Sequence, residues 1–199
     1  VLSNECAACQ RTVRGGVVVG GPGSIGEQGL LSLGRFAAAL AGDPAGSGLK
    51  EGMEVLRHET GANRCELFLV DGQGDELLLV EEVSRRPRHR GPERLQLQDG
   101  LEGLSVERGE PLWADITPVG LALEREDLVE ADFAAALCVP VCQEGEAVGV
   151  LQLVWRRDLW AEARRQIGRF VNCAMPLLAA QVMSTQQRGL VDLLLSCRN

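Results

Sequence analysis

The stretch LCVPVCQEGEAVGVLQLVW, Leu137 to Trp155, decides how this chain folds. Two apolar runs, 134–143 and 147–155, flank the short polar sequence EGE, and this pattern predicts two strands joined by a tight turn. Cys138 and Cys142 lie in the first run, four residues apart. The question they raise is whether this hairpin carries a reactive thiol site or is a buried wall of the domain.

A second hairpin is predicted earlier in the chain. RCELFLV (64–70) and ELLLVEEV (76–83) are apolar strands, and DGQGD between them is made of residues that tolerate positive φ. Residues 84–133 then carry several prolines, so we expect a mostly irregular segment with a short strand at Leu95–Leu97. An irregular segment of this length inside a compact domain is usually functional.

Helices are predicted on either side of the hairpins. Apolar spacing indicates helices over Ile25–Ala41 and from Leu49 to Thr60. A long helix follows Trp155, with Asp158 as its N-cap and a kink at Pro176, because proline removes one backbone donor. The apolar residues of this helix recur at spacings of three and four, which is typical of a helix packed on a partner helix: Ile167, Val171, Ala174, Leu178 and Val182.

Length, charge and cysteine content exclude several classes of protein. The chain has 199 residues, of which 45% are hydrophobic, enough for one domain with tails. A net charge of -8 argues against direct nucleic-acid binding. Seven irregularly spaced cysteines and the lack of a long apolar run predict a cytoplasmic protein with no membrane partner. Because the chain begins at Val1, a fragment of a longer protein stays an open alternative.

The order of these elements resembles that of a GAF domain. GANRCELFLVDGQGDELLLVEEV (61–83) is similar to the family's first hairpin, LQLQDGLEGLSVERGEPLWADI (95–116) to its middle motif, and AALCVPVCQEGEAVGVLQLVW (135–155) to its second hairpin. The resemblance covers about residues 49–182. It implies an α+β fold: a GAF-like antiparallel β-sheet with N- and C-terminal helices packed on one face and a ligand pocket on the other.

This resemblance suggests a division of the chain into four parts. Residues 1–24 form a flexible Gly-rich N-terminal segment with a CxxC sequence, and 25–48 an N-terminal helix and linker. Residues 49–182 form the GAF-like domain, and 183–199 a helical extension. The extension carries Leu190, Leu193 and Leu194, which a monomer would expose, so we expect a homodimer held partly by this helix.

The pocket is expected between the strand face and residues 84–133. That segment is long enough to fold over a ligand and too poor in periodicity to be packed core. Trp113 and Phe133 are its largest apolar groups, although both could instead fill the core. His89 and Arg90, in the run RRPRHRGPER, are candidates to orient an anionic or polar group, although such charge runs are usually solvated. The predicted ligand-binding residues are Phe68, His89, Arg90, Trp113, Phe133 and Cys138.

The spacing of the cysteines favours a structural role over a metal-binding or reactive one. On a straight strand Cys138 and Cys142 lie about 13 Å apart, so they cannot share a zinc ion, and we interpret them as small buried fillers. Cys6 and Cys9 have ligand spacing without a second pair, so no metal site is predicted and these two stay weak candidates. The glycine pattern at Gly21 lacks the strand–helix–strand context of a dinucleotide site.

Three functions compete on these grounds. The first is a sensory domain that binds a small molecule of unknown identity and signals through its terminal helices to an output domain or partner protein, with the cofactor unknown. The second is a cysteine-based metal or redox sensor. The third resembles the free methionine sulfoxide reductase branch of the family, but GLEG (100–103) stands where that branch places a thiol. We therefore expect a binding domain and not an enzyme.

Overall fold

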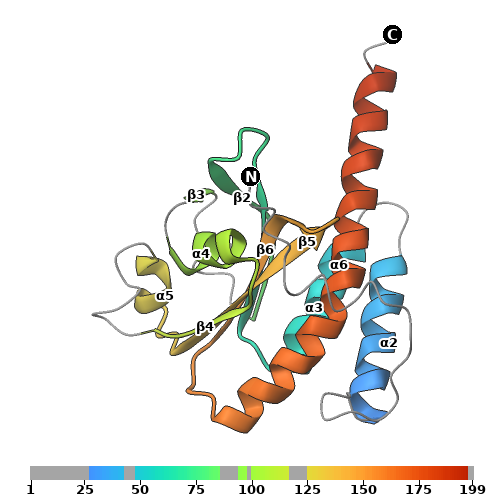
Figure 1. Cartoon of the computed structure of the whole chain (residues 1–199). Helices are drawn as coiled ribbons and strands as arrows, with labels where there is room; N and C mark the ends of the chain where they lie inside the picture. The colour runs from blue at the N-terminus through green and yellow to red at the C-terminus, as the bar shows by residue number, and fades with distance from the viewer. Residues whose placement is uncertain (1–26, 43–47, 86–93, 98–99, 117–124, 197–199) are drawn as a thin grey trace.

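The computed structural model describes residues 27–42, 48–85, 94–97, 100–116 and 125–196. A six-stranded antiparallel sheet with helices confirms the predicted α+β fold, and shorter helices also cover the face on which only a pocket was predicted (Figure 1). The strands are β1 (Arg64–Val70), β2 (Glu76–Ser84), β3 (Arg94–Gln96), β4 (Leu112–Asp115), β5 (Ala135–Gln143) and β6 (Glu146–Trp155). The helices are α2 (Glu27–Ala41), α3 (Gly48–Thr60), α4 (Gly100–Arg108), α5 (Glu126–Glu130) and α6 (Ala161–Ser196).

The two predicted hairpins form the middle of the sheet, whose strand order is β3-β2-β1-β6-β5-β4. β1 and β6 pair at the centre, with Leu67 opposite Leu151. The turn between β5 and β6 has positive φ at Glu144 (50°) and Gly145 (94°), which matches the twist of a tight two-residue hairpin. A β-bulge after Val141 interrupts the alternation of β5, so side chains beyond it no longer follow the register of the first seven residues.

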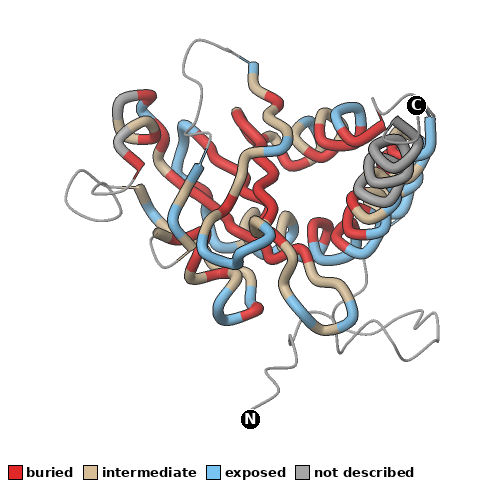
Figure 2. The backbone as a smooth tube through the Cα atoms, turned by 90° about the horizontal axis from the view of Figure 1, so that it is seen from above, coloured by how far each residue is buried: buried red, intermediate tan, exposed pale blue. Residues whose placement is uncertain are grey.

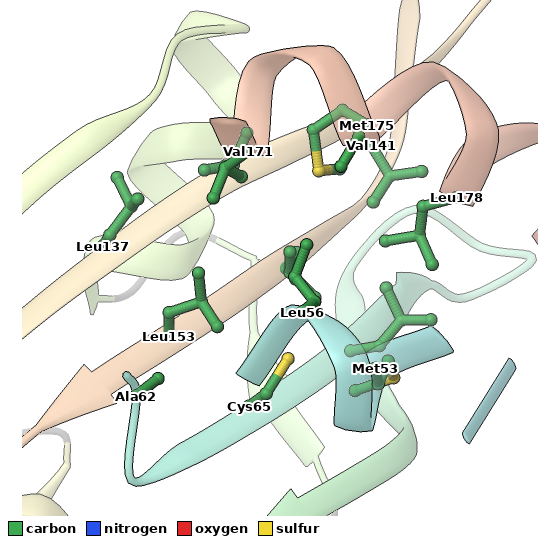
Figure 3. Close-up of a cluster of buried hydrophobic side chains, with 14 of the residues drawn as sticks. Met53, Leu56, Ala62, Cys65, Leu137, Val141, Leu153, Val171, Met175 and Leu178 are labelled. Atoms are coloured by element: carbon green, nitrogen blue, oxygen red, sulfur yellow. The ribbon is translucent and has the colours of Figure 1, made fainter. Parts of the chain in front are cut away.

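One face of the sheet is covered by α2, α3 and α6. Figure 3 shows Met53 and Leu56 of α3 and Leu178 of α6 directed toward strand residues such as Leu153. All four side chains are fully buried, and each contributes about 1.5–3 kcal/mol through removal of apolar surface from water. This larger cluster is the main core of the domain.

The other face is covered by α4 and α5, which lie on the opposite side of the sheet from the longer helices (Figure 1). A second apolar cluster fills it, including Phe68, Leu128, Phe133 and Cys138. Buried backbone follows the strands and the inner sides of the helices, whose outer sides are exposed (Figure 2). Alternate residues of each central strand therefore belong to two separate cores.

The segment 84–133 is more regular than predicted. Within its described part β3 spans Arg94–Gln96, one residue earlier than expected, and α4, β4 and α5 follow. The side chain of Ser105, in α4, donates to the Glu110 carbonyl at 2.9 Å and fastens the helix to the turn that leads into β4. Pro111 lies between α4 and β4, where it separates two short elements.

The long helix packs on its own domain. α6 begins at Ala161 rather than beside Asp158, and its seam residues from Val171 to Val182 are buried in the main core. Their partner helices are α2 and α3 of the same chain. The helix continues through Pro176 to Ser196, and Figure 1 shows its axis changing direction along its length. No helix in the described part of the chain is long and apolar enough to span a bilayer.

Candidate functional site

A group of polar side chains lies buried between the sheet and the helices α4 and α5. Strand alternation turns Glu66 of β1 and Gln152 of β6 toward this face, where α4 contributes Glu102. Arg125 enters just before α5. These four side chains are at most 4% exposed, so each has exchanged water for protein partners. Such burial costs several kcal/mol per charge unless the partners are well placed.

Arg125 is the centre of this buried group. Its Nη2 donates to Glu66 Oε2 at 2.9 Å, and its Nη1 donates to Gln152 Oε1 at 2.9 Å and to Glu102 Oε1. Its Nε donates to Asp127 Oδ1 at 2.8 Å. One guanidinium thus joins a central strand of each hairpin, α4 and α5, in charge-assisted bonds that are about twice as strong as neutral ones.

A second arginine extends the group toward the end of the sheet. Arg64 Nη2 donates to Asp127 Oδ2 at 2.6 Å, and its Nε lies 3.4 Å from Glu66 Oε1. Its guanidinium carbon lies 5.0 Å from the ring centroid of Phe133, and that of Arg125 lies 5.9 Å from the ring of Phe68. Both aromatic rings add cation–π attraction to a site from which water is excluded.

The charged side chains within the group shift one another's pKa values. Burial opposes the charged form of Arg125, but Glu66 and Glu102 outweigh it and raise the pKa of Arg125 well above its usual value. Burial likewise opposes the charged form of Asp127, while hydrogen bonds from Arg125 and Arg64 lower its pKa overall. Two arginines therefore face three carboxylates: Glu66, Glu102 and Asp127.

Cys138 lies at the edge of the group. Gln152 Nε2 donates to Glu102 Oε1 at 2.6 Å and lies 3.5 Å from the Cys138 sulfur. Burial, with the nearby charge of Glu102, raises the pKa of the Cys138 thiol well above its usual value. The thiol is therefore protonated at neutral pH and acts as a weak acceptor and an apolar filler here.

Little space is left around Arg125. The cavity between the sheet, α4 and α5 measures about 10 Å³ and is lined by Leu101, Glu102, Ile116, Arg125, Leu128, Val129, Ala136 and Gln152. A ligand of any size needs more volume than this. The guanidinium of Arg125 lies at this place, between the sheet, α4 and α5.

The predicted ligand-binding residues fall into three groups. Phe68, Phe133 and Cys138 lie together on the face of the sheet that holds the buried polar group. Trp113 does not join them: β4 pairs Trp113 with Leu137 of β5, which places it on the opposite face, where it stacks on Trp155 at 5.5 Å. The remaining two, His89 and Arg90, lie outside the described residues, as do the weak metal candidates Cys6 and Cys9.

The sequence analysis missed the four residues at the centre of the site. Glu66 interrupts the apolar run RCELFLV and Gln152 the run VLQLVW, and a polar residue inside a buried strand was the available signal. Glu102 and Arg125 carried no comparable signal, because exposed helices and loops are rich in such residues. The described residues contain no group of three His, Cys, Asp or Glu side chains able to hold a metal ion.

The family model and the similar solved structures agree on one family. The GAF domain family model matches residues 47–171, well over half of the chain. The GAF domain of a phosphoenolpyruvate-protein phosphotransferase from Coxiella burnetii is 25% identical, with a TM-score of 0.66 over 81% of this chain and 96% of that one. The nlh2 GAF domain of A. aeolicus, in an inactive state, is 16% identical, with a TM-score of 0.64 over 79% and 97%. No curated protein matches the sequence.

The prediction that this chain is not an enzyme is contradicted by other structures of this fold. A free methionine-R-sulfoxide reductase from Neisseria meningitidis, solved in complex with its substrate, is 17% identical, with a TM-score of 0.62 over 83% of this chain and 96% of that one. Reductases from Thermoplasma acidophilum and Staphylococcus aureus are also similar. These identities show a shared fold, and a fold that includes enzymes gives no ground for excluding catalysis.

Asp127 makes the stability of this face depend on pH. Its pKa is lowered in the folded protein, so its ion pairs stabilise the fold above the unfolded-state pKa of about 3.9 and this contribution is lost as pH falls below it. Asp127→Asn should therefore lower the free energy of unfolding at pH 7 by about 1.5–3 kcal/mol, measured by urea denaturation. The difference between the two proteins should begin to shrink as the pH falls below about 4 and should continue to shrink as Asp127 is protonated in the folded protein.

Asp115→Asn is the matched control, because Asp115 forms an ion pair with Arg164 on the surface and is 65% exposed. Its removal should change stability by less than about 1 kcal/mol. A pH-independent loss in Asp127→Asn, or an equal loss in Asp115→Asn, would contradict the role assigned to the buried carboxylate.

Proposed function

Because the chain belongs to the GAF domain family, we propose that it is a sensory domain whose ligand binds between the sheet and the helices α4 and α5. Domains of this family are in general sensory or regulatory. The ligand proposed here is a small molecule with an amino or guanidino group, which replaces the side chain of Arg125.

The observation that supports the proposal most strongly is the burial of Glu66 and Glu102 under α4 and α5. A face that served only to attach two short helices would be more stable with apolar residues of similar volume. Buried charges held by specific partners are common at functional sites. This cluster also lies on the sheet face opposite the main core, where it is not needed to hold the long helices.

The chemistry of the proposed ligand follows from the partners of Arg125. Glu66, Glu102 and the side-chain carbonyl of Gln152 all present oxygen atoms to one guanidinium. A ligand that displaced this guanidinium without carrying a positive charge would leave Glu102 buried without its ion-pair partner and Glu66 with Arg64 alone, at a cost of several kcal/mol. A cationic ligand meets the same three acceptors.

Displacement of Arg125 provides a signal. Arg125 directly precedes α5 and also binds Asp127 within it, so its departure removes one of the contacts that hold α5 to the sheet and leaves the Arg64–Asp127 pair. On β5, Cys138 faces the site while its neighbours Leu137 and Val139 face the main core, against which α6 packs. A shift of β5 is thus passed to α6, and we propose that α6 reports to an output domain or partner protein.

The test is a titration of the whole chain with four cationic probes: agmatine, arginine, lysine and putrescine. At least one should bind saturably in calorimetry and raise the melting temperature. Glu102→Gln should weaken that binding by about tenfold or more, since hydrogen bonds to charged groups contribute about 1.5–3 kcal/mol. Circular dichroism establishes that the variant is folded, and Gln152→Leu serves as a second variant.

Glu162→Gln is the control, because Glu162 lies on the surface of α6 and, among the residues that the structure describes, pairs with Arg165 and Gln166 of the same helix. It removes the same charge and should leave the affinity unchanged. If none of the four probes binds, or if Glu102→Gln binds as tightly as the wild type, the proposed site is wrong.

We also propose that the protein is a homodimer through the C-terminal part of α6. The apolar residues at 190, 193 and 194 continue the helical spacing after the seam, from Val171 to Val182, has been used within the domain. Light scattering at micromolar concentration should give twice the mass of the chain, and deletion of residues 183–199 should halve it. A monomeric full-length chain would refute this proposal.

A further inference from the structure

A hollow lies at one end of the sheet, apart from the buried polar group. Its volume is about 210 Å³, and its lining residues are Asn63, Arg64, Ser84, Arg85, Ala131, Phe133 and Arg156. The start of β1, the end of β2 and the end of β6 meet there, because antiparallel pairing sets Arg64 opposite both Ser84 and Val154. Three arginines from distant parts of the sequence therefore surround one space.

The backbone fixes the positions of the two outer arginines. The amide of Arg85 donates to the Asn63 carbonyl at 3.1 Å, and the amide of Arg156 donates to the Asn63 side-chain oxygen at 2.9 Å. The guanidinium carbon of Arg156 also lies 5.5 Å from the ring centroid of Phe133. Asn63 thus sets both residues beside the hollow, which is a built arrangement and not a chance gathering of mobile side chains.

The charge at this place is positive in an acidic protein. Arg64 is paired with Asp127 and Glu66, so its charge is compensated. Arg85 and Arg156 form no ion pair with any residue that the structure describes, and both are exposed at the hollow. Arg85 and Arg156 thus add two positive charges beside a buried group in which two arginines face three carboxylates, in a chain whose net charge is -8.

We propose that this hollow binds the phosphate group of a small phosphorylated molecule. A phosphate monoester carries a charge of about -1.5 to -2 at pH 7, which matches the charges of Arg85 and Arg156. The planar guanidinium fork suits phosphate oxygens in a bidentate way. The volume exceeds that of one phosphate group, and Phe133 and Ala131 give the remainder an apolar wall for the rest of the ligand.

The proposed phosphate site communicates with the buried polar group through one residue. Arg64 lines the hollow and also holds Asp127, the residue that joins α5 to the network. A phosphate that attracted the Arg64 guanidinium would weaken its bond to Asp127. Binding at the hollow therefore influences α5, although the phosphate site stands on its own arginines and does not require a cationic ligand at Arg125.

The test is calorimetric titration of the whole chain with O-phosphoserine and pyrophosphate at constant ionic strength. Both should bind saturably at one site. Arg156→Ala and Arg85→Ala should each weaken that binding by roughly 10- to 100-fold, because each removes charge-assisted hydrogen bonds. Both side chains are exposed, so circular dichroism and melting temperature should be those of the wild type.

Arg157→Ala is the matched control, since Arg157 is the exposed chain neighbour of Arg156, lies outside the lining of the hollow, and approaches Gly61 instead. It removes the same charge and should change the affinity by less than about twofold. Absence of saturable binding, equal weakening in Arg157→Ala, or tighter binding of citrate than of pyrophosphate would each overturn the proposal. The last result would assign the hollow to carboxylates.

Discussion

The guanidinium of Arg125 compensates two carboxylates that the fold buries, and the placement of α4 and α5 depends on that compensation. Glu66 is fixed by the pairing of β1 at the centre of the sheet, and Glu102 is carried by α4. Neither could lie there at 1% exposure or less without a positive partner. Loss of one partner from such a group typically costs 3–5 kcal/mol. The helices α4 and α5 are therefore held to the sheet by the ion pairs of Arg125 as well as by apolar contacts.

The sheet separates two environments by the alternation of its strands. Leu67 and Leu153 contact the long helices, while Glu66 and Gln152, one residue away, contact α4 and Arg125. We propose that a movement on the polar face reaches the apolar core across the thickness of this single sheet. Close packing makes that core responsive to displacements of this kind, because it has few voids in which a shift could be absorbed.

The hairpins and the main helices were predictable because their signals are local. The turn at Glu144 and Gly145 and the alternating apolar strands around it needed no knowledge of distant residues. The site was not predictable in this way. Arg125 meets Glu66 across 59 positions of sequence, and only the polar interruption of each buried strand hinted at a partner. The face on which Trp113 lies was not predictable either. It is set by the register of β4 against β5, and a shift of register by one residue would place Trp113 on the other face of the sheet.

We propose that the place of the Arg125 side chain is a binding site for a cation, and the variant Arg125→Ala tests this proposal directly. The variant opens that place and removes the competing side chain, so N-ethylguanidinium titrated by calorimetry at low millimolar concentration should bind one to one and raise the melting temperature of the variant. N-ethylurea has the same shape without the charge and should do neither. Absence of saturable binding of the cation, or equal binding of the neutral compound, would contradict the account.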